Sequence, residues 1–232
     1  MTDTTAAAPA PDSTSPRPAG AGAPAAPSRR APHPVLVQLE QLYPALFGAT
    51  VQPLKRGIFQ DLLAAHGEVL DKAQLKVAMA IHTRSTRYLQ AVASGAARHD
   101  LQGQAVEPMA PEHVLHAVLE VFKRRKPRPG ETVEQQQQRL QRRIAQIFSD
   151  SGLTREALLE RANIKEPTAL ATLTAALDYA AEQDARAEAV QRAFAASGAA
   201  SPAAFAQMYG MHPKAVERQL ARAAQLQTLR NA

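Results

Sequence analysis

Apolar residues recur at helical spacing through most of this 232-residue chain. Such stripes, with apolar positions three and four apart, predict successive helices in the first half of the chain. They lie at residues 33–47, 56–65, 72–82, 84–92 and from about 111 to the basic run at 123–126. Residues 97–107 alternate instead, and Gln102-Gly103 supplies a turn, so we predict a small hairpin there. The pattern indicates a mainly α, multihelical region with one hairpin.

Several residues predict where individual helices start. Pro34 suits a first helical turn, and Pro44 limits or kinks the first helix. Asp71 is predicted to cap the helix that starts at Lys72, and Thr83 the helix that starts at Arg84. The helix 72–82 should bury most of one apolar face, formed by Leu75, Ala78, Met79 and Ile81. We expect the histidines at 66, 82, 99 and 212 to lie at the surface or at its edge.

The composition changes at Pro127-Arg128-Pro129-Gly130, the clearest boundary in the chain. We therefore predict a domain at 33–126, a linker at 127–131 and a separate all-helical C-terminal extension at 132–232. The extension should contain helical stretches near 132–148, 154–163, 167–196 and 202–230, the third of which could be broken.

Two patterns stand out in the extension. Ser151-Gly152 and Pro167 recur 46 residues later as Ser197-Gly198 and Pro213, which is either chance or a repeated helical hairpin. The end of the chain resembles a helix-turn-helix with Gly210 in the turn. Its second helix offers Lys214, Arg218 and Arg222, either for nucleic-acid contact or as a solvated face of a packed hairpin.

Residues 1–32 are mostly Ala, Pro, Ser, Thr and Gly, so we predict a disordered tail. The tail acts either as a solubilising linker or, through Arg29 and Arg30, as a weak tether for a polyanion. It lacks the apolar segment of a signal peptide, and no run of the chain is long and apolar enough to span a membrane. We expect a cytoplasmic monomer.

The chain carries 27 Lys and Arg against 21 Asp and Glu, a net charge of +6, and has a pI of about 9.9. This balance is typical of nucleic-acid binders, although many basic proteins bind none. Cysteine is absent, which excludes disulfides and a thiol nucleophile. The basic run 123–126 could equally interact with the carboxyl end of its own helix.

Basic residues in the stretch 53–100 lie at helical spacing on faces that the apolar stripe leaves free. Lys72 and Lys76 share one face, while Arg84, Arg87 and Tyr88 share another. If Thr83 caps a new helix, unpaired backbone amides and the positive helix end lie beside these cations. This arrangement predicts a phosphate-binding surface.

The block from about Pro34 to Lys126 resembles the ProQ/FinO family of bacterial RNA-binding proteins. The residues that carry the resemblance are PLKRGIFQDL (53–62), DKAQLKVAM (71–79), HTRSTRYL (82–89) and GAARHDLQG (95–103). It implies a compact multihelical domain with a small hairpin. Its concave side would bind structured RNA, notably the 3′-terminal hairpins and single-stranded tails of small regulatory RNAs and messages.

The resemblance also implies which residues bind RNA. Basic positions of the family look retained at Lys55, Lys72, Lys76, Arg87 and Arg98. Tyr88 matches the tyrosine of the concave face, whereas without the resemblance a core-edge aromatic is the simpler interpretation. Thr83 and the residues after it, Arg84 and Ser85, match the helix start that receives the RNA 3′ end.

We predict an RNA-binding post-transcriptional regulator or RNA chaperone, with no enzymatic activity and no cofactor. The alternative is a helical adaptor whose residues 132–232 recruit a protein partner or contact DNA. No Gly-rich phosphate loop is present. Glu112, His113 and His116 superficially suit a metal, but they lack a convincing further ligand, so we predict no metal site.

Overall fold

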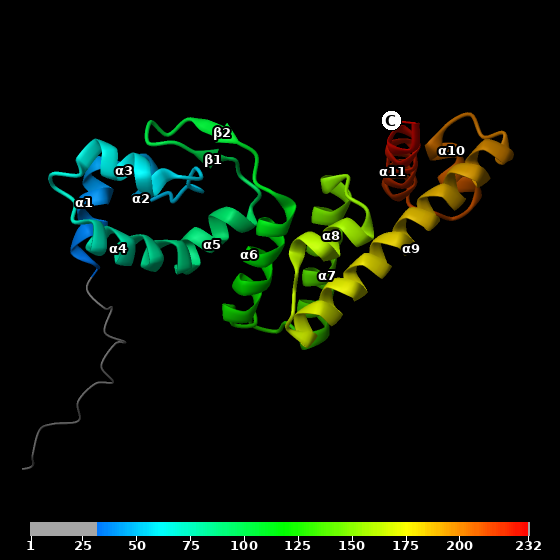
Figure 1. Ribbon diagram of the computed structural model, residues 1–232. Coiled ribbons are helices and arrows are strands. Elements are labelled where there is room, and N and C mark those ends of the chain that lie inside the picture. The colour runs from blue at the N-terminus through cyan, green and yellow to red at the C-terminus, as the bar shows by residue number, and fades with distance from the viewer. Residues whose placement is uncertain (1–31, 232) are drawn as a thin grey trace, which may run out of the picture. The chain divides into compact units, whose positions relative to one another are not determined.

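The computed structural model describes residues 32–231 (Figure 1). The predictions of a disordered N-terminal tail and of a polyanion tether at Arg29 and Arg30 concern residues outside this range. From His33 onward the chain belongs to one compact unit. Its helices are α1 (Pro34–Leu42), α2 (Pro44–Phe47), α3 (Ile58–His66), α4 (Lys72–Arg84), α5 (Thr86–Ala93), α6 (Pro111–Arg124), α7 (Val133–Ser151), α8 (Arg155–Ala162), α9 (Pro167–Ser197), α10 (Pro202–Met208) and α11 (Pro213–Asn231). The fold is therefore mainly α, as predicted.

The predicted hairpin is present as β1 (Arg98–His99) and β2 (Ala105–Glu107), which pair antiparallel. Leu54 adds an isolated parallel bridge to His99, so the segment before α3 is fastened to the hairpin. Two backbone bonds hold this junction: the amide of Lys55 donates to the His99 carbonyl at 2.8 Å, and the amide of His99 donates to the Pro53 carbonyl at 2.7 Å.

Proline divides the first predicted helix into two. Pro44 occupies the first turn of α2, while α1 ends at Leu42. A proline inside a helix has no N–H for the i−4 bond and clashes with the carbonyl of the preceding turn, so the chain restarts the helix there. The apolar face of α1 nevertheless continues into α2, because Leu39, Leu46 and Phe47 share one core.

The helix α4 confirms one predicted cap and contradicts another. The Asp71 carboxylate accepts from the amide of Gln74 at 2.8 Å, as an N-cap does. Thr83, however, lies inside the last turn of α4, where its hydroxyl donates to the Met79 carbonyl at 2.8 Å. The predicted cap at Thr83 is therefore wrong, and the next helix starts two residues later than expected.

The buried face of α4 also differs from the prediction at two positions. Ile81 is 47% exposed, whereas His82 is only 7% exposed and packs between the rings of Phe47 and Tyr88. Helical spacing allows either residue to extend the face of Leu75 and Ala78. The aromatic neighbours come from α2 and α5, so only the tertiary structure decides that the imidazole is buried.

One apolar core runs from α1 through α6 into α9. It includes Leu75 of α4, Leu115 of α6, Ile144 of α7 and Leu173 of α9. A smaller cluster of Phe205, Ala206 and Val216 holds α10 to α11, with Phe194 of α9 packed against it. Helix α6 therefore carries the packing from the first helices to the later ones, and the division into domains at residues 127–131 stays a prediction.

The repeat in the second half of the chain has matching geometry. Both α7 and α9 end at a glycine with positive φ, Gly152 and Gly198. A residue with a Cβ would be strained in this backbone conformation. The serine before each glycine donates to a phenylalanine carbonyl and accepts from a backbone amide two residues on. A short helix with a Thr154 or Ser201 cap follows each time. The two helical hairpins are therefore built alike.

Helix α9 is continuous over 31 residues, so the break considered within it is absent. The last predicted stretch is instead divided into α10 and α11, with Gly210 in the turn, as the helix-turn-helix pattern suggested. Of the three basic residues on α11, Arg222 is not available to a partner. Its guanidinium is bonded to Asp184 of α9 and Ser149 of α7.

Candidate nucleic-acid interface

The junction between α4 and α5 is the centre of the candidate site. Ser85 ends α4 and starts α5, with its hydroxyl accepting from the amide of Tyr88 at 3.2 Å. Since the first amides of a helix have no intrahelical partner, the backbone N–H groups of Thr86 and Arg87 mark the positive end of α5. The helix start that the sequence assigned to Thr83 is thus supplied by Ser85.

Four exposed cations lie along α4 and at the start of α5. Lys72, Lys76 and Arg84 are exposed on α4, and Arg87 is exposed on α5. Within residues 32–231 none of the four pairs with a carboxylate. Their charges are therefore not neutralised by the protein itself, which is the state that a polyanion requires of its binding surface.

Arg87 also has a structural contact. Its Nη2 atom donates to the carbonyls of Gly48 and Ala49, at 2.8 and 2.7 Å. These carbonyls belong to the loop after α2, so the guanidinium joins that loop to the start of α5. Because carbonyls are neutral acceptors, the positive charge of Arg87 remains available to an anion.

Two other predicted cations are compensated by nearby carboxylates. Lys55 forms an ion pair with Asp61 at 2.8 Å, and the hydrogen bond that its ammonium group donates to this carboxylate raises the pKa of Lys55. The Arg98 side chain is 13% exposed, and its Nε atom lies 3.5 Å from Glu107. Arg98 also contacts the ring of His113 at 3.3 Å. Burial, and second the charge of Arg98, lower the pKa of His113.

Tyr88 and Arg98 meet at the backbone of one residue, Leu54. The Tyr88 hydroxyl accepts from the Leu54 amide at 3.3 Å, and Arg98 Nη1 donates to the Leu54 carbonyl at 3.0 Å. The fold thus brings these two predicted site residues together, because both bond to the backbone of the segment around Leu54. Both are largely enclosed, however, and act first to position the Leu54 segment and the hairpin.

The ring of Tyr88 is buried rather than presented to solvent. The residue is only 8% exposed, and its ring lies 5.2 Å from that of His82. Base stacking by Tyr88 would need an open ring face and does not fit this burial. The core-edge interpretation describes the ring, while the hydroxyl retains a hydrogen that it can donate.

Buried His82 lies beside the candidate site. Burial, and second the charge of Arg87, lower the pKa of His82 from 6.5 to about 4. Its Nε2 atom is buried without a hydrogen-bond partner among the described residues. The imidazole is therefore neutral near pH 7, and it supports the start of α5 through ring packing rather than charge.

The basic run at the end of α6 extends the site. Arg124 Nη1 donates to the carbonyl of Arg84 at 2.6 Å, which places the end of α6 against the α4–α5 junction. Arg124 and Lys123 both pair with Glu120. Arg125 and Lys126 are exposed and, in the part of the chain that the structure describes, have no ion-pair partner. The sequence showed this charge run but not its proximity to Arg84.

The histidines near α6 have protein partners. His113 contacts Arg98, and His116 Nε2 lies 2.8 Å from the Ala162 carbonyl. Across residues 32–231, no group of three His, Cys, Asp or Glu residues is arranged to hold a metal ion. In the same range no helix is long and apolar enough to cross a bilayer.

Comparisons with known proteins concern the first part of the chain. The model of the ProQ/FINO family matches residues 29–134. A FinO-like RNA chaperone of known crystal structure, from Neisseria meningitidis, is 32% identical, with 85% of that chain and 36% of this chain covered and a TM-score of 0.33. Residues 29–134 of the chain therefore form a domain of the ProQ/FinO family.

Curated relatives include proteins named RNA chaperone ProQ. That of Shewanella frigidimarina is 40% identical over 89 residues, and that of Shewanella oneidensis is 41% identical over 87 residues. The matches cover 37% and 36% of this chain, and 44% and 41% of those relatives. The chain thus spans less than half of the length of these relatives.

Proposed function

We propose that this protein is an RNA-binding chaperone and post-transcriptional regulator, which binds structured RNA through the α4–α5 junction. The observation that carries the proposal is the row of exposed cations without carboxylate partners along α4 and at the start of α5, among the residues that the structure describes. The names of its curated relatives and its ProQ/FinO-family domain at residues 29–134 support the same class of partner.

Each part of the site would contact a different part of the RNA. Lys72 and Lys76, one turn apart on α4, would follow the phosphates of a duplex stem. The A-form major groove is too narrow for side chains to read the bases, so such contacts recognise shape. The free amides at the start of α5, with Arg84 and Arg87, would bind the last phosphodiester group and the free 3′ hydroxyl group of the RNA, so that a further phosphate at this end would be in excess. We therefore propose a 3′-terminal hairpin with a short single-stranded tail as the preferred RNA.

A charge-matched pair of variants tests the binding of the stem. Lys72→Gln/Lys76→Gln should weaken binding to a terminator hairpin and lower the log–log salt slope by about 2, because each lysine should neutralise one phosphate. Arg161→Gln/Arg192→Gln removes the same charge from exposed positions on α8 and α9. Equal weakening by the two double variants would reduce the effect to net charge and defeat the proposed site.

A second experiment tests recognition of the RNA end. A hairpin with a 3′ phosphate, or one trimmed of its tail, should bind more weakly than the same hairpin with a free 3′ hydroxyl. Ser85→Ala should reduce this difference, because it loosens the start of α5. Identical affinity for free and blocked ends would exclude the helix-terminus mechanism while leaving the binding of the stem in place.

A protein partner for residues 132–231 is the second candidate function. Large apolar side chains are exposed at the α10–α11 turn, with Met208 at 60% and Tyr209 at 55%. Such residues occur at the centres of protein interfaces. Met208→Gln/Tyr209→Gln should release a copurifying protein while keeping hairpin affinity. The expected cytoplasmic location and monomeric state are tested by fractionation and by sedimentation.

A further inference from the structure

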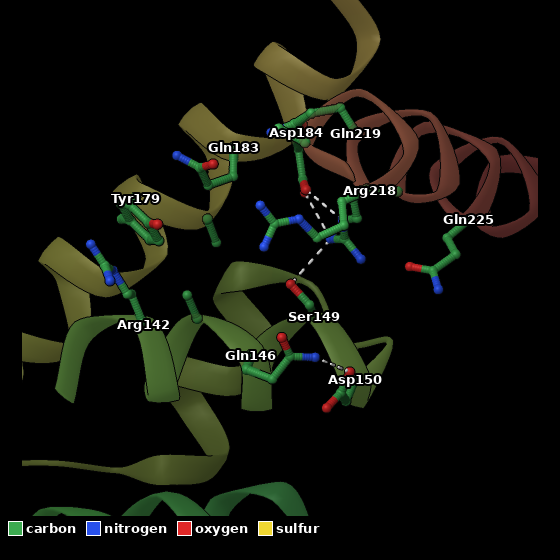
Figure 2. A pocket seen from close by; sticks show the side chains of 14 residues that line it. Arg142, Gln146, Ser149, Asp150, Tyr179, Gln183, Asp184, Arg218, Gln219 and Gln225 are labelled. Carbon is green, nitrogen blue, oxygen red and sulfur yellow. Dashed lines mark hydrogen bonds and ion pairs between the residues drawn. The ribbon is translucent and has the colours of Figure 1, made fainter. Parts of the chain in front are cut away.

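A polar groove lies between α7, α9 and α11, away from the candidate interface described above. Its volume is about 570 Å³, within the range of about 300–1,000 Å³ found for ligand sites. Side chains from all three helices converge on it, including Arg142 and Gln146 of α7, Tyr179 and Gln183 of α9, and Arg218 and Gln219 of α11 (Figure 2).

An ion pair holds the walls of the groove in place. Arg222 of α11 donates to both carboxylate oxygens of Asp184 on α9, at 2.7 and 3.0 Å, and to the Ser149 hydroxyl of α7 at 3.1 Å. The guanidinium thus joins all three helices at one point. Since these bonds form within the protein itself, the groove is preformed.

Two arginines of the groove remain available. Arg142 and Arg218 are exposed, and within residues 32–231 neither pairs with a carboxylate. The only side-chain bond recorded for Arg218 in that range runs from its Nε atom to the Lys214 carbonyl, at 3.2 Å. Arg222 has its compensating carboxylate, so the groove offers the positive charges of Arg142 on α7 and Arg218 on α11. The exposed carboxylate of Asp150 also lines the groove, and it accepts a hydrogen bond from Gln146.

The groove continues along α11 through Arg218. A neighbouring recess of about 530 Å³ is lined by His212, Lys214 and Glu217, and it shares Arg218 and Ala215 with the groove. Lys214 and Arg218 are one helical turn apart and face the same recess. The three cations Arg142, Arg218 and Lys214 therefore mark a path rather than a single point.

The lining of the groove favours one class of partner. Its apolar surface comes from alanines and from the half-buried ring of Tyr179, while the other lining side chains are charged, amide or hydroxyl groups. A protein or peptide partner would need apolar pockets for its anchoring side chains. Amides that both donate and accept, an aromatic ring and arginines are instead the groups that bind unpaired nucleotides.

We propose that this groove binds single-stranded RNA, with Arg142, Arg218 and Lys214 contacting phosphates, Tyr179 stacking on a base and Gln183 and Gln219 bonding base edges. The choice of RNA rests on the proposed function, but the residues are separate from the α4–α5 site. The protein would then hold a folded stem at one site and an unpaired segment at the other.

The test uses the full chain and two probes: a terminator hairpin, and an unstructured RNA of about 10 nucleotides, within the usual range of single-strand sites. Arg142→Gln/Arg218→Gln should weaken binding to the unstructured RNA roughly tenfold and lower its salt slope by about 1.4, at about 0.7 for each phosphate that is no longer bound. The charge-matched control Arg161→Gln/Arg192→Gln should leave both quantities unchanged.

Tyr179 offers a second, independent measurement. Tyr179→Phe should keep affinity because it keeps the ring, whereas Tyr179→Ala should weaken binding roughly tenfold, the usual effect of removing a stacked ring. Thermal unfolding of each variant separates weaker binding from loss of fold. Equal affinity of the Phe and Ala variants for the unstructured RNA would overturn the assignment of Tyr179.

The remaining outcomes separate the groove from the α4–α5 site. If Arg142→Gln/Arg218→Gln and the control Arg161→Gln/Arg192→Gln weaken binding to the unstructured RNA equally, the groove is not an RNA site. The same conclusion follows if neither double variant weakens this binding. If Arg142→Gln/Arg218→Gln weakens binding to an acidic peptide but not to the unstructured RNA, the proposal is overturned in favour of a protein partner. A wild-type chain that binds the unstructured RNA through the groove but ignores the hairpin would refute the proposed function while supporting this inference.

Discussion

The hydroxyl of Tyr88 accepts a hydrogen bond from the buried backbone amide of Leu54, 34 residues earlier in the chain. This bond joins α5 to the Leu54 segment, which pairs with the hairpin at His99. Tyr88 therefore stabilises the packing of the elements that form the candidate site. Tyr88→Phe should therefore destabilise the fold by about 1–2 kcal/mol, because it leaves the Leu54 amide without its partner. Tyr88→Ala should cost about 3–5 kcal/mol through the cavity it creates.

The two variants are compared by chemical denaturation before RNA binding is measured. Tyr88→Phe is the informative variant for binding, since Tyr88→Ala would lose affinity through unfolding alone. A Tyr88→Phe variant as stable as the wild type would show that the hydroxyl bond to Leu54 is not formed.

Ser85 and Thr83 differ in their effect on stability, although both are hydroxyl residues near the same junction. Ser85→Ala removes the cap of α5 and should cost about 1 kcal/mol. Thr83→Ala removes only a bond from a hydroxyl to the carbonyl one turn earlier and adds a better helix former, so it should be close to neutral. Urea unfolding of both variants measures the difference. The reverse order would restore Thr83 as the helix start.

Arg87 combines charge with two bonds to loop carbonyls. Arg87→Lys keeps the charge but loses the planar guanidinium, and should cost about 1–2 kcal/mol of stability at the loop after α2. Arg87→Gln loses the charge as well, and should bind RNA more weakly than Arg87→Lys. Hydrogen exchange of residues 48–50 reports the loop. If both variants leave this exchange unchanged, the two carbonyl contacts have no structural role.

His82 should make the fold sensitive to acid. Its pKa is about 4 in the folded protein against 6.5 when exposed, so below pH 6.5 the unfolded chain binds a proton that the folded chain does not. The stabilisation is complete above about pH 6.5 and is lost as the pH falls towards 4. Wild type should lose on the order of 2 kcal/mol more than His82→Phe between about pH 7 and pH 4.5.

Unfolding free energies of both proteins across this range give the comparison. His82→Phe also tests the ring packing, since the new ring would take the place between Phe47 and Tyr88. Parallel stability curves for the two proteins would mean that His82 titrates normally.

The ion pair between Arg222 and Asp184 should stabilise the packing of α9 and α11. Both side chains are more than three-quarters buried, and a double-mutant cycle with alanine should give a coupling of about 1–3 kcal/mol. The matched comparison is Arg155 with Asp178, a more exposed pair at 2.6 Å that should give less than about 1 kcal/mol. If the coupling between Arg222 and Asp184 is no larger than that between Arg155 and Asp178, the ion pair does not stabilise the groove.

The order and type of the elements in this chain follow from its sequence. Asp71 caps α4 by a bond to a residue three positions away, and Pro44 breaks a helix through its own ring, so local chemistry decides both. The repeat is equally local, because Ser151 and Ser197 each bond only within their own turn. Such signals are readable without a fold.

The tertiary structure decided which charges and rings remain available. Lys72 and Lys76 stay exposed, as their spacing suggested, but Arg98 is matched by Glu107 and Tyr88 is buried against Leu54. Each of those partners comes from a different segment of the chain, and burial depends on how the helices pack. The sequence by itself therefore determined most of the helices, the cap at Asp71 and the basic character, whereas packing alone determined which basic and aromatic groups face a partner.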